Sequence, residues 1–350
     1  MADVGRRNVF DDRHRRDTRS GRCGVGVAFV RHDRRGGRGR CGRCDGGRLR
    51  CAEYADGDAV GWRAFPRNGG RRRCVGGGHG SGSAIDFDAV LTANSIATTG
   101  SANAYSVNFD AAPDVATTGT FANTGGVTFA AGGAFDGGLN VSGGTTTLTG
   151  ALTTTGAALT LGAVSLGGAA SLASADGVIT LGAVDGGSSS FTLDAGTGGR
   201  ISGTSITNTA SLTVVNASSA ADAVAFTGDL TSLGAIDFNG TQGGTYTVGG
   251  ALTAATLTTD TGGGDGAFSL VLNGGGTVTN AVAFDNTGDL TLGNGGVGVD
   301  AFTFTGGANT SAVGGTVTLG STITSGSGQA LTFGATTLDA STLLDSNDGV

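Results

Sequence analysis

The sequence contains no lysine, and it has only 2 Pro, 1 Met and 1 Trp in 350 residues. After residue 80 it also lacks Cys, His and Glu, and Arg200 is its one remaining basic residue. Without Cys, this part of the chain has no disulfide framework. Without His and Lys it lacks the usual basic partners of catalytic carboxylates, so acid–base chemistry there would depend on Asp and a single Arg.

Long apolar runs are missing as well. No stretch approaches the roughly 18 apolar residues that a membrane-spanning helix needs. The short run from Cys23 to Val30, between Arg22 and Arg31, resembles the apolar core of a weak signal peptide. Because no small-residue cleavage site follows it, we expect any export signal to lie outside this chain.

The charge is divided unevenly along the chain. The segment at 1–80 holds 20 of the 21 basic side chains, all of them Arg, and 9 acidic ones, which gives about +11. The segment at 81–350 holds 19 Asp and Arg200, or −18, and the two parts sum to the net charge of −7. We therefore predict two regions, an Arg-, Gly- and Cys-rich segment at 1–84 and a Gly-, Thr- and Ala-rich segment at 85–350.

The segment at 1–84 is predicted to form no folded core. Its composition fits either a disordered basic arm or GC-rich DNA translated upstream of, or out of frame with, the true coding sequence. The stretch from Arg34 to Arg40 resembles the Arg-Gly segments of RNA-binding proteins, but few aromatic residues are interleaved, so we predict no nucleic-acid partner. The glycines at 37, 39 and 42 match a dinucleotide-binding pattern without a strand before it or a helix after it.

A zinc site is another hypothesis for the same segment. Cys41 and Cys44 form a CxxC pair, and Cys51, Cys74 and His79 could complete four ligands. No second CxxC is present, and the surrounding arginines would repel a dication. We therefore predict no metal ligands here.

From Val127 onward the sequence alternates apolar and small polar residues in short runs. A period of two places one set of side chains on a core face and the other set outside. Gly-Gly, Asn-Gly, Asp-Gly and Thr-Gly pairs between the runs supply the positive φ angles of tight turns. The pattern predicts an all-β region, with strands at runs such as Val127-Thr-Phe129, Leu139-Asn-Val141, Leu159-Thr-Leu161, Leu212-Thr-Val214, Leu290-Thr-Leu292 and Val317-Thr-Leu319.

Short sequence words recur in this region. Thr-Leu-Gly-Ala-Val at Thr160 returns at Thr180. Thr-Gly-Asp-Leu-Thr at Thr227 returns at Thr287, each copy preceded by Ala-Val-Ala-Phe, at close to three times the first spacing. Self-similarity at a fixed period indicates a solenoid, and about 20 residues hold three short strands and three turns. We therefore predict a parallel β-helix with coils of about 20 residues.

Two other structures compete with the solenoid. A β-sandwich also has short strands at regular intervals with turn signals between them, but it gives no reason for the words to repeat. Disorder would fit the abundance of Gly, Ser and Thr, but the recurring apolar runs supply core positions along the whole region.

The stretches at 139–166, 223–238 and 268–292 resemble the β-strand repeats of filamentous haemagglutinin-type adhesins and autotransporter passenger domains. The resemblance covers most of 85–350. It implies a right-handed β-helix in a bacterial exoprotein that lies outside the cell or at the outer membrane and binds host or bacterial surface glycans or proteins. The family's secretion domain and membrane β-barrel are not recognisable here. We therefore expect a C-terminally truncated segment of a larger protein, with outer-membrane association only through parts outside this chain.

Three kinds of chemistry are candidates for the repeat region. The stretch from Gly295 to Phe302 fits the GGxGxDxU calcium repeat of RTX proteins, but it is present as a single copy. The Asp-Gly pairs at Asp136 and Asp265 resemble part of the same repeat and are also single copies. A polysaccharide lyase or hydrolase would need clustered carboxylates beside a base, for which only Arg200 is available. Threonine runs resemble ice-binding solenoids, but no threonine pair recurs once per coil.

The sequence therefore predicts a structural or adhesive β-solenoid that is not an enzyme, with no catalytic residue, cofactor or metal ligand. A calcium-binding RTX-like exoprotein and a β-helix polysaccharide-active enzyme are the alternatives.

Overall fold

The computed structural model describes residues 82–100, 104–259, 266–295, 300–339 and 342–349, and the backbone of two strands at 63–65 and 73–75. The regular elements of these residues are all β-strands, and none of the described residues forms a helix long and apolar enough to cross a membrane. β1 and β2 pair in antiparallel fashion, whereas the strands that follow stack in parallel. The predicted all-β class is confirmed.

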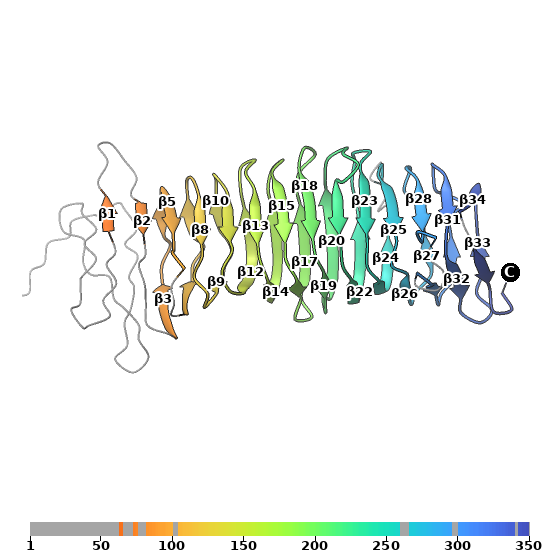
Figure 1. The fold of residues 1–350 in the computed structure, drawn as a ribbon, viewed down its shortest axis with the longest axis horizontal. Coiled ribbons are helices and arrows are strands. Elements are labelled where there is room, and N and C mark those ends of the chain that lie inside the picture. Colours follow the sequence, from red (N-terminus) through yellow and green to blue (C-terminus); the bar gives the residue numbers. More distant parts are fainter. Residues whose placement is uncertain are drawn as a thin grey trace, which may run out of the picture.

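The strands form three sheets that run along a rod (Figure 1). The first sheet has 14 strands, and from β2 onward each pairs in parallel with the strand of the next coil. Its strands are β1 (Arg63–Phe65), β2 (Arg73–Val75), β5 (Ser95–Ala97), β8 (Gly119–Phe121), β11 (Leu139–Val141), β13 (Leu159–Leu161), β15 (Val178–Leu181), β18 (Arg200–Gly203), β21 (Val224–Phe226), β23 (Thr245–Val248), β25 (Ser269–Leu272), β28 (Leu290–Leu292), β31 (Val317–Leu319) and β34 (Thr336–Leu338).

The second sheet has 18 strands and the third has 3. The strands of the second sheet are β3 (Ser83–Phe87), β4 (Thr92–Ala93), β6 (Tyr105–Phe109), β7 (Asp114–Val115), β9 (Val127–Phe129), β10 (Gly133–Phe135), β12 (Thr146–Thr153), β14 (Val164–Ala173), β16 (Val184–Asp185), β17 (Ser190–Asp194), β19 (Ile206–Thr207), β20 (Ser211–Asn216), β22 (Leu230–Phe238), β24 (Leu252–Thr258), β26 (Gly276–Val278), β29 (Phe302–Phe304), β32 (Thr322–Ser325) and β35 (Leu343–Asp345). Those of the third sheet are β27 (Val282–Ala283), β30 (Ala308–Asn309) and β33 (Leu331–Thr332).

One coil contains three strand positions. The chain passes through β11 in the first sheet and then through β12, whose pairing shifts register between Leu148 and Gly150 and so divides the strand into two halves. It then returns to the first sheet at β13. Further along the rod, β27 of the third sheet stacks on the second half of β24. The amide of Asn280, which lies just before β27, donates to the Ala255 carbonyl of β24 at 2.9 Å.

The strands stack as about 12 coils of about 21 residues, which confirms the predicted β-solenoid. Thr160 pairs with Thr180, so the repeated Thr-Leu-Gly-Ala-Val word marks successive coils. The coil length is not constant, because Leu290 pairs with Val317 and Val317 with Thr336. Figure 1 shows the coils following one another along the long axis of the rod.

The longer echo, from Thr227 to Thr287, does not mark three coils, and this prediction was wrong. Three coils after Val224 the first-sheet ladder reaches Leu290, and Val282 lies in the third sheet. The last two residues of the two Thr-Gly-Asp-Leu-Thr words therefore begin strands in different sheets. The word repeats a local turn and strand start, and it carries no information about the coil period.

The core is a set of apolar columns, one residue per coil. On the first sheet the inward column is fully buried and consists of Leu139, Leu159, Ile179, Ile201, Val224, Tyr246, Leu270, Leu290 and Val317. In the last described coil the inward Leu338 and Leu344 are 62% and 45% exposed. Burial of an inward residue therefore depends on coils on both sides of it.

Aromatic rings fill the core of the first coils. Phe87, Phe109 and Phe129 pair in register and stack with ring centroids 4.9 and 5.3 Å apart and interplanar angles of 7° and 3°. Phe121 and Phe135, from the facing strands, contact Phe129 edge-on at 6.1 and 5.7 Å. Offset stacks and edge-on pairs of this kind add to the stability gained by burial alone.

Tight turns join the strands, and Gly132 shows why glycine is needed there. It has φ +73° between β9 and β10, in the left-handed region that favours glycine. A Cβ at this position would also overlap the backbone of Ala151 in the next coil. The turn is thus fixed both by its own conformation and by the coil stacked on it.

We expect Phe129→Ala to destabilise the solenoid by about 3–5 kcal/mol, because it leaves a cavity beneath three other rings. The matched control is Thr128→Ala, which changes the adjacent outward residue and should cost within about 0.5 kcal/mol. Denaturant unfolding followed by circular dichroism measures both effects. Equal losses for the two variants would contradict the assignment of Phe129 to the core.

Candidate functional site

The outward side chains of the first sheet form a column of short residues, most of them polar. The middle residue of each Leu-Thr-Leu type strand points away from the core, and the paired registers place these residues one above another. The column consists of Thr120, Asn140, Thr160, Thr180, Ser202, Ala225, Thr247, Val271, Thr291, Thr318 and Thr337. We call this set the first column.

The second sheet carries a second column. It is formed by the outward side chains at the first of the two strand positions that a coil contributes to this sheet. It contains Asn108, Thr128, Thr147, Ser165, Asp185, Thr207, Thr231, Thr253, Thr277, Thr303 and Thr324. Each pairs in register with the next except Thr231 and Thr253, which follow the paired Leu230 and Leu252 where the register shifts. Parallel strands lie about 4.8 Å apart, so each column offers hydroxyl or amide groups at multiples of that spacing. The series is interrupted by Ala225 and Val271 in the first column and by the carboxylate of Asp185 in the second. Sequence reasoning missed both columns: the runs contain these threonines, but their alignment depends on the register between coils.

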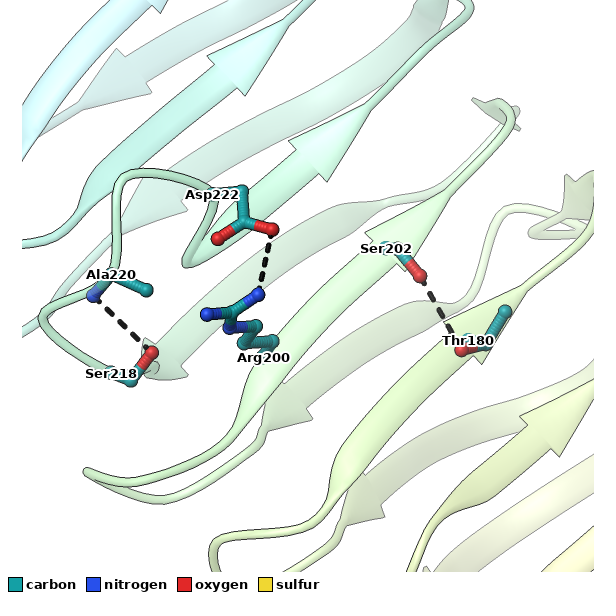
Figure 2. A network of polar contacts seen from close by, with 6 residues as sticks. All are labelled: Thr180, Arg200, Ser202, Ser218, Ala220 and Asp222. Carbon is teal, nitrogen blue, oxygen red and sulfur yellow. Dashed lines mark hydrogen bonds and ion pairs between the residues drawn. The ribbon is translucent and has the colours of Figure 1, made fainter.

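The ion pair between Arg200 and Asp222 joins two coils on the outside of the rod (Figure 2). Arg200 Nη1 lies 2.8 Å from Asp222 Oδ2, and the two side chains are 49% and 62% exposed. An exposed pair of this kind contributes at most about 1 kcal/mol. Beside it, Ser202 Oγ donates to Thr180 Oγ1 at 3.4 Å within the first column. This ion pair fits a contact that holds two coils together, in which one carboxylate, that of Asp222, lies against the guanidinium of Arg200.

Aspartates beside glycine cap turns in this solenoid, as their sequence context predicts. Asp185 Oδ1 accepts the Gly187 amide at 3.1 Å within its own turn. Asp176 Oδ1 accepts the amide of Gly198 in the next coil at 2.7 Å. Backbone amides thus occupy carboxylate oxygens at these turns.

Asp300, the acidic residue of the RTX-like stretch, is 2% exposed, and its Oδ2 accepts the Asn294 amide at 2.8 Å. The stacking of β29 on β26 and β32 places Gly274 and Ser321 at the equivalent positions of the two adjacent coils. An RTX calcium site instead uses carboxylates of successive turns. Residues 296–299 of the stretch and the Asp265 pair fall outside the described residues.

The other hypotheses concern residues whose side chains the structure does not describe. These include the zinc candidates Cys41, Cys44, Cys51, Cys74 and His79, the Arg-Gly segment from Arg34 to Arg40, and the apolar run from Cys23 to Val30. Within the described ranges, no three His, Cys, Asp or Glu side chains lie together in a way that could hold a metal ion.

Two tyrosines are the most strongly perturbed titratable groups of the described chain. Tyr105 and Tyr246 are each 1% exposed, and their hydroxyls donate to the carbonyls of Thr99 and Asn239, both at 2.8 Å. Burial raises the pKa of both phenols above 10.0, because the phenolate would lose its hydration. These groups secure turns and are held in the neutral form.

We expect calcium to leave the fold unchanged. The full chain should give the same β-type circular dichroism spectrum and the same melting temperature in millimolar calcium and in chelator, because a backbone amide occupies Asp300 Oδ2. Gain of β structure only with calcium would instead favour the RTX-like alternative. A coil spectrum in both conditions would contradict the solenoid itself.

We expect the solenoid to lose stability as the pH rises above about 10. Below that pH, Tyr105 and Tyr246 are neutral in both the folded and the unfolded chain. Above it the unfolded chain releases protons that the folded chain retains, since burial raises the folded-state pKa of both residues. Tyr54 is the third tyrosine of the chain, and Tyr54→Phe removes its absorbance. In this variant, tyrosinate absorbance should rise only together with the loss of β structure. Titration of either tyrosine in the folded state would contradict this.

Comparison with known proteins gave no match to any family model, curated protein or solved structure, so the architecture of the rod and its polar columns are the basis for a function.

Proposed function

We propose that this chain is a structural and adhesive β-solenoid segment of a large bacterial exoprotein, displayed at the cell surface or secreted. In this role the solenoid is a rod that separates or presents binding surfaces, and catalysis has no part in it. The partners are glycans or proteins on host or bacterial surfaces. Association with the outer membrane would use parts of the protein outside this chain.

The observation that carries the proposal is the uninterrupted stack of about 12 coils. At about 4.8 Å per coil the stack spans roughly 60 Å, which is long for its mass because the core is only one coil wide. A rod of this shape suits spacing and display. The sequence resemblance to filamentous haemagglutinin-type repeats points in the same direction.

The outer faces support an adhesive role. Both columns present hydroxyl and amide groups in most coils along the parallel strands. Hydroxyl and amide groups both donate and accept hydrogen bonds, as do the hydroxyls of a glycan. A long regular face allows many weak contacts to act together, which raises the total affinity without a deep pocket.

The surface charge suits a rod at high local density. The segment at 81–350 carries 19 Asp and a single Arg, so neighbouring rods repel one another. Short polar side chains and negative charge also discourage pairing between exposed strand edges. These properties keep a long β-structure soluble outside the cell.

Binding of the labelled full chain to glycan arrays and to intact bacterial and epithelial cells tests the proposal. We expect saturable binding that falls about tenfold or more when Thr160, Thr180 and Thr247 are changed together to Val, a loss of about 1.4 kcal/mol or more. The matched control changes Thr147, Thr207 and Thr277 of the second column to Val. Val preserves strand propensity, so both variants should keep their β spectrum.

A different result would count against adhesion. Absence of binding to every surface would contradict the adhesive part of the role, and unchanged binding in both variants would contradict a contact through either column. Release of reducing sugar ends from a polysaccharide would favour the enzyme alternative. In that case Arg200→Ala should abolish the release.

A further inference from the structure

Asp229 and Asp289 belong to the two Thr-Gly-Asp-Leu-Thr words, and each reaches into the following coil. Asp229 Oδ1 accepts the Ala251 amide at 2.9 Å, and Asp289 Oδ1 accepts the Thr316 amide at 2.8 Å. The two contacts have the same geometry although β22 lies in the second sheet and β28 in the first. The same five-residue sequence therefore makes the same contact in two different sheets of the rod.

Each aspartate adds one hydrogen bond between two coils at the start of a strand pair. The amide of Leu230 donates to the Ala251 carbonyl at 2.8 Å, and the amide of Leu290 donates to the Thr316 carbonyl at 3.0 Å. These are the first main-chain bonds of the two strand pairs. Because the aspartate side chain accepts the amide of the same partner residue, both polar groups of Ala251 and of Thr316 bond to the preceding coil.

The following coil has a matching sequence. A Gly-Gly pair precedes each partner residue, at 249–250 before Ala251 and at 314–315 before Thr316. A Cβ at Gly250 would overlap Asp229 Oδ1 and the backbone of Gly228. A Cβ at Gly315 would overlap Asp289 Oδ1 and the backbone of Gly288. At both contacts a Gly-Asp-Leu-Thr word in one coil thus faces a Gly-Gly-X-apolar-Thr word in the next.

We propose that these paired words form a coil-to-coil device, the aspartate latch, that fixes the register at which a new coil begins. The latch at Asp289 joins residues 27 positions apart, across the longest coil of the first-sheet ladder. A local latch sets the strand start whatever the length of the loop that precedes it. It works through a carboxylate and a backbone amide, so it needs no metal ion.

Amide hydrogen exchange on the full chain tests the latch, with site resolution from NMR. Asp229→Ala should speed exchange of the Ala251 amide about tenfold or more while leaving Thr316 unchanged, because a bond to a charged acceptor is lost at one latch alone. Asp289→Ala should have the reciprocal effect. Asp229→Asn, which keeps an acceptor oxygen and loses the charge, should fall between Asp229→Ala and the unaltered chain.

Two further variants keep the test decisive if Asp229→Ala fails to fold. Gly250→Ala leaves the carboxylate in place and should speed Ala251 exchange, because its Cβ would overlap Asp229 Oδ1 and the backbone of Gly228. Asp222→Ala removes an exposed ion pair and should leave both amides unchanged. Unchanged exchange in both Asp229→Asn and Gly250→Ala would overturn the proposal, as would protection of Ala251 that disappears in chelator. The latch is independent of adhesion, so loss of cell binding does not affect it.

Discussion

Parallel backbone hydrogen bonding between successive coils is the constraint on which the rest of this structure depends. The Leu139 amide donates to the Ala158 carbonyl at 3.0 Å, and equivalent bonds follow along the rod. The strands of each coil satisfy their polar backbone groups through the neighbouring coils, as in other solenoids. The exposed Leu338 and Leu344 of the last described coil show the same dependence, since their inward position alone does not bury them.

This stacking converts a sequence that alternates every second residue into columns. Inward positions give continuous apolar stacks such as Phe87, Phe109 and Phe129, whose rings contact from coil to coil. Outward positions give the two threonine-rich columns. A substitution therefore acts on a stack of like residues, and its effect reaches the neighbouring coils more than distant ones.

The turns show how an acidic chain with little opposing charge holds its coils together. In these turns a carboxylate accepts a backbone amide, either within the turn, as at Asp185, or across coils, as at Asp176, Asp229 and Asp289. A bond of this kind needs no basic side chain, which suits a region with Arg200 as its only base. The acidic groups that form turns are also the groups that give the rod its negative surface.

The sequence by itself determined the all-β class, the solenoid and its approximate coil length. Alternation fixes which side chains face inward, and the Thr160 and Thr180 words lie in adjacent coils as their spacing predicts. Only the tertiary structure decided which residues align. Loops of variable length shift the register, so Val224 stacks below Tyr246 and not in line with Val282. The threonine columns and the aspartate contacts depend on this alignment between coils, which spacing along the chain does not encode.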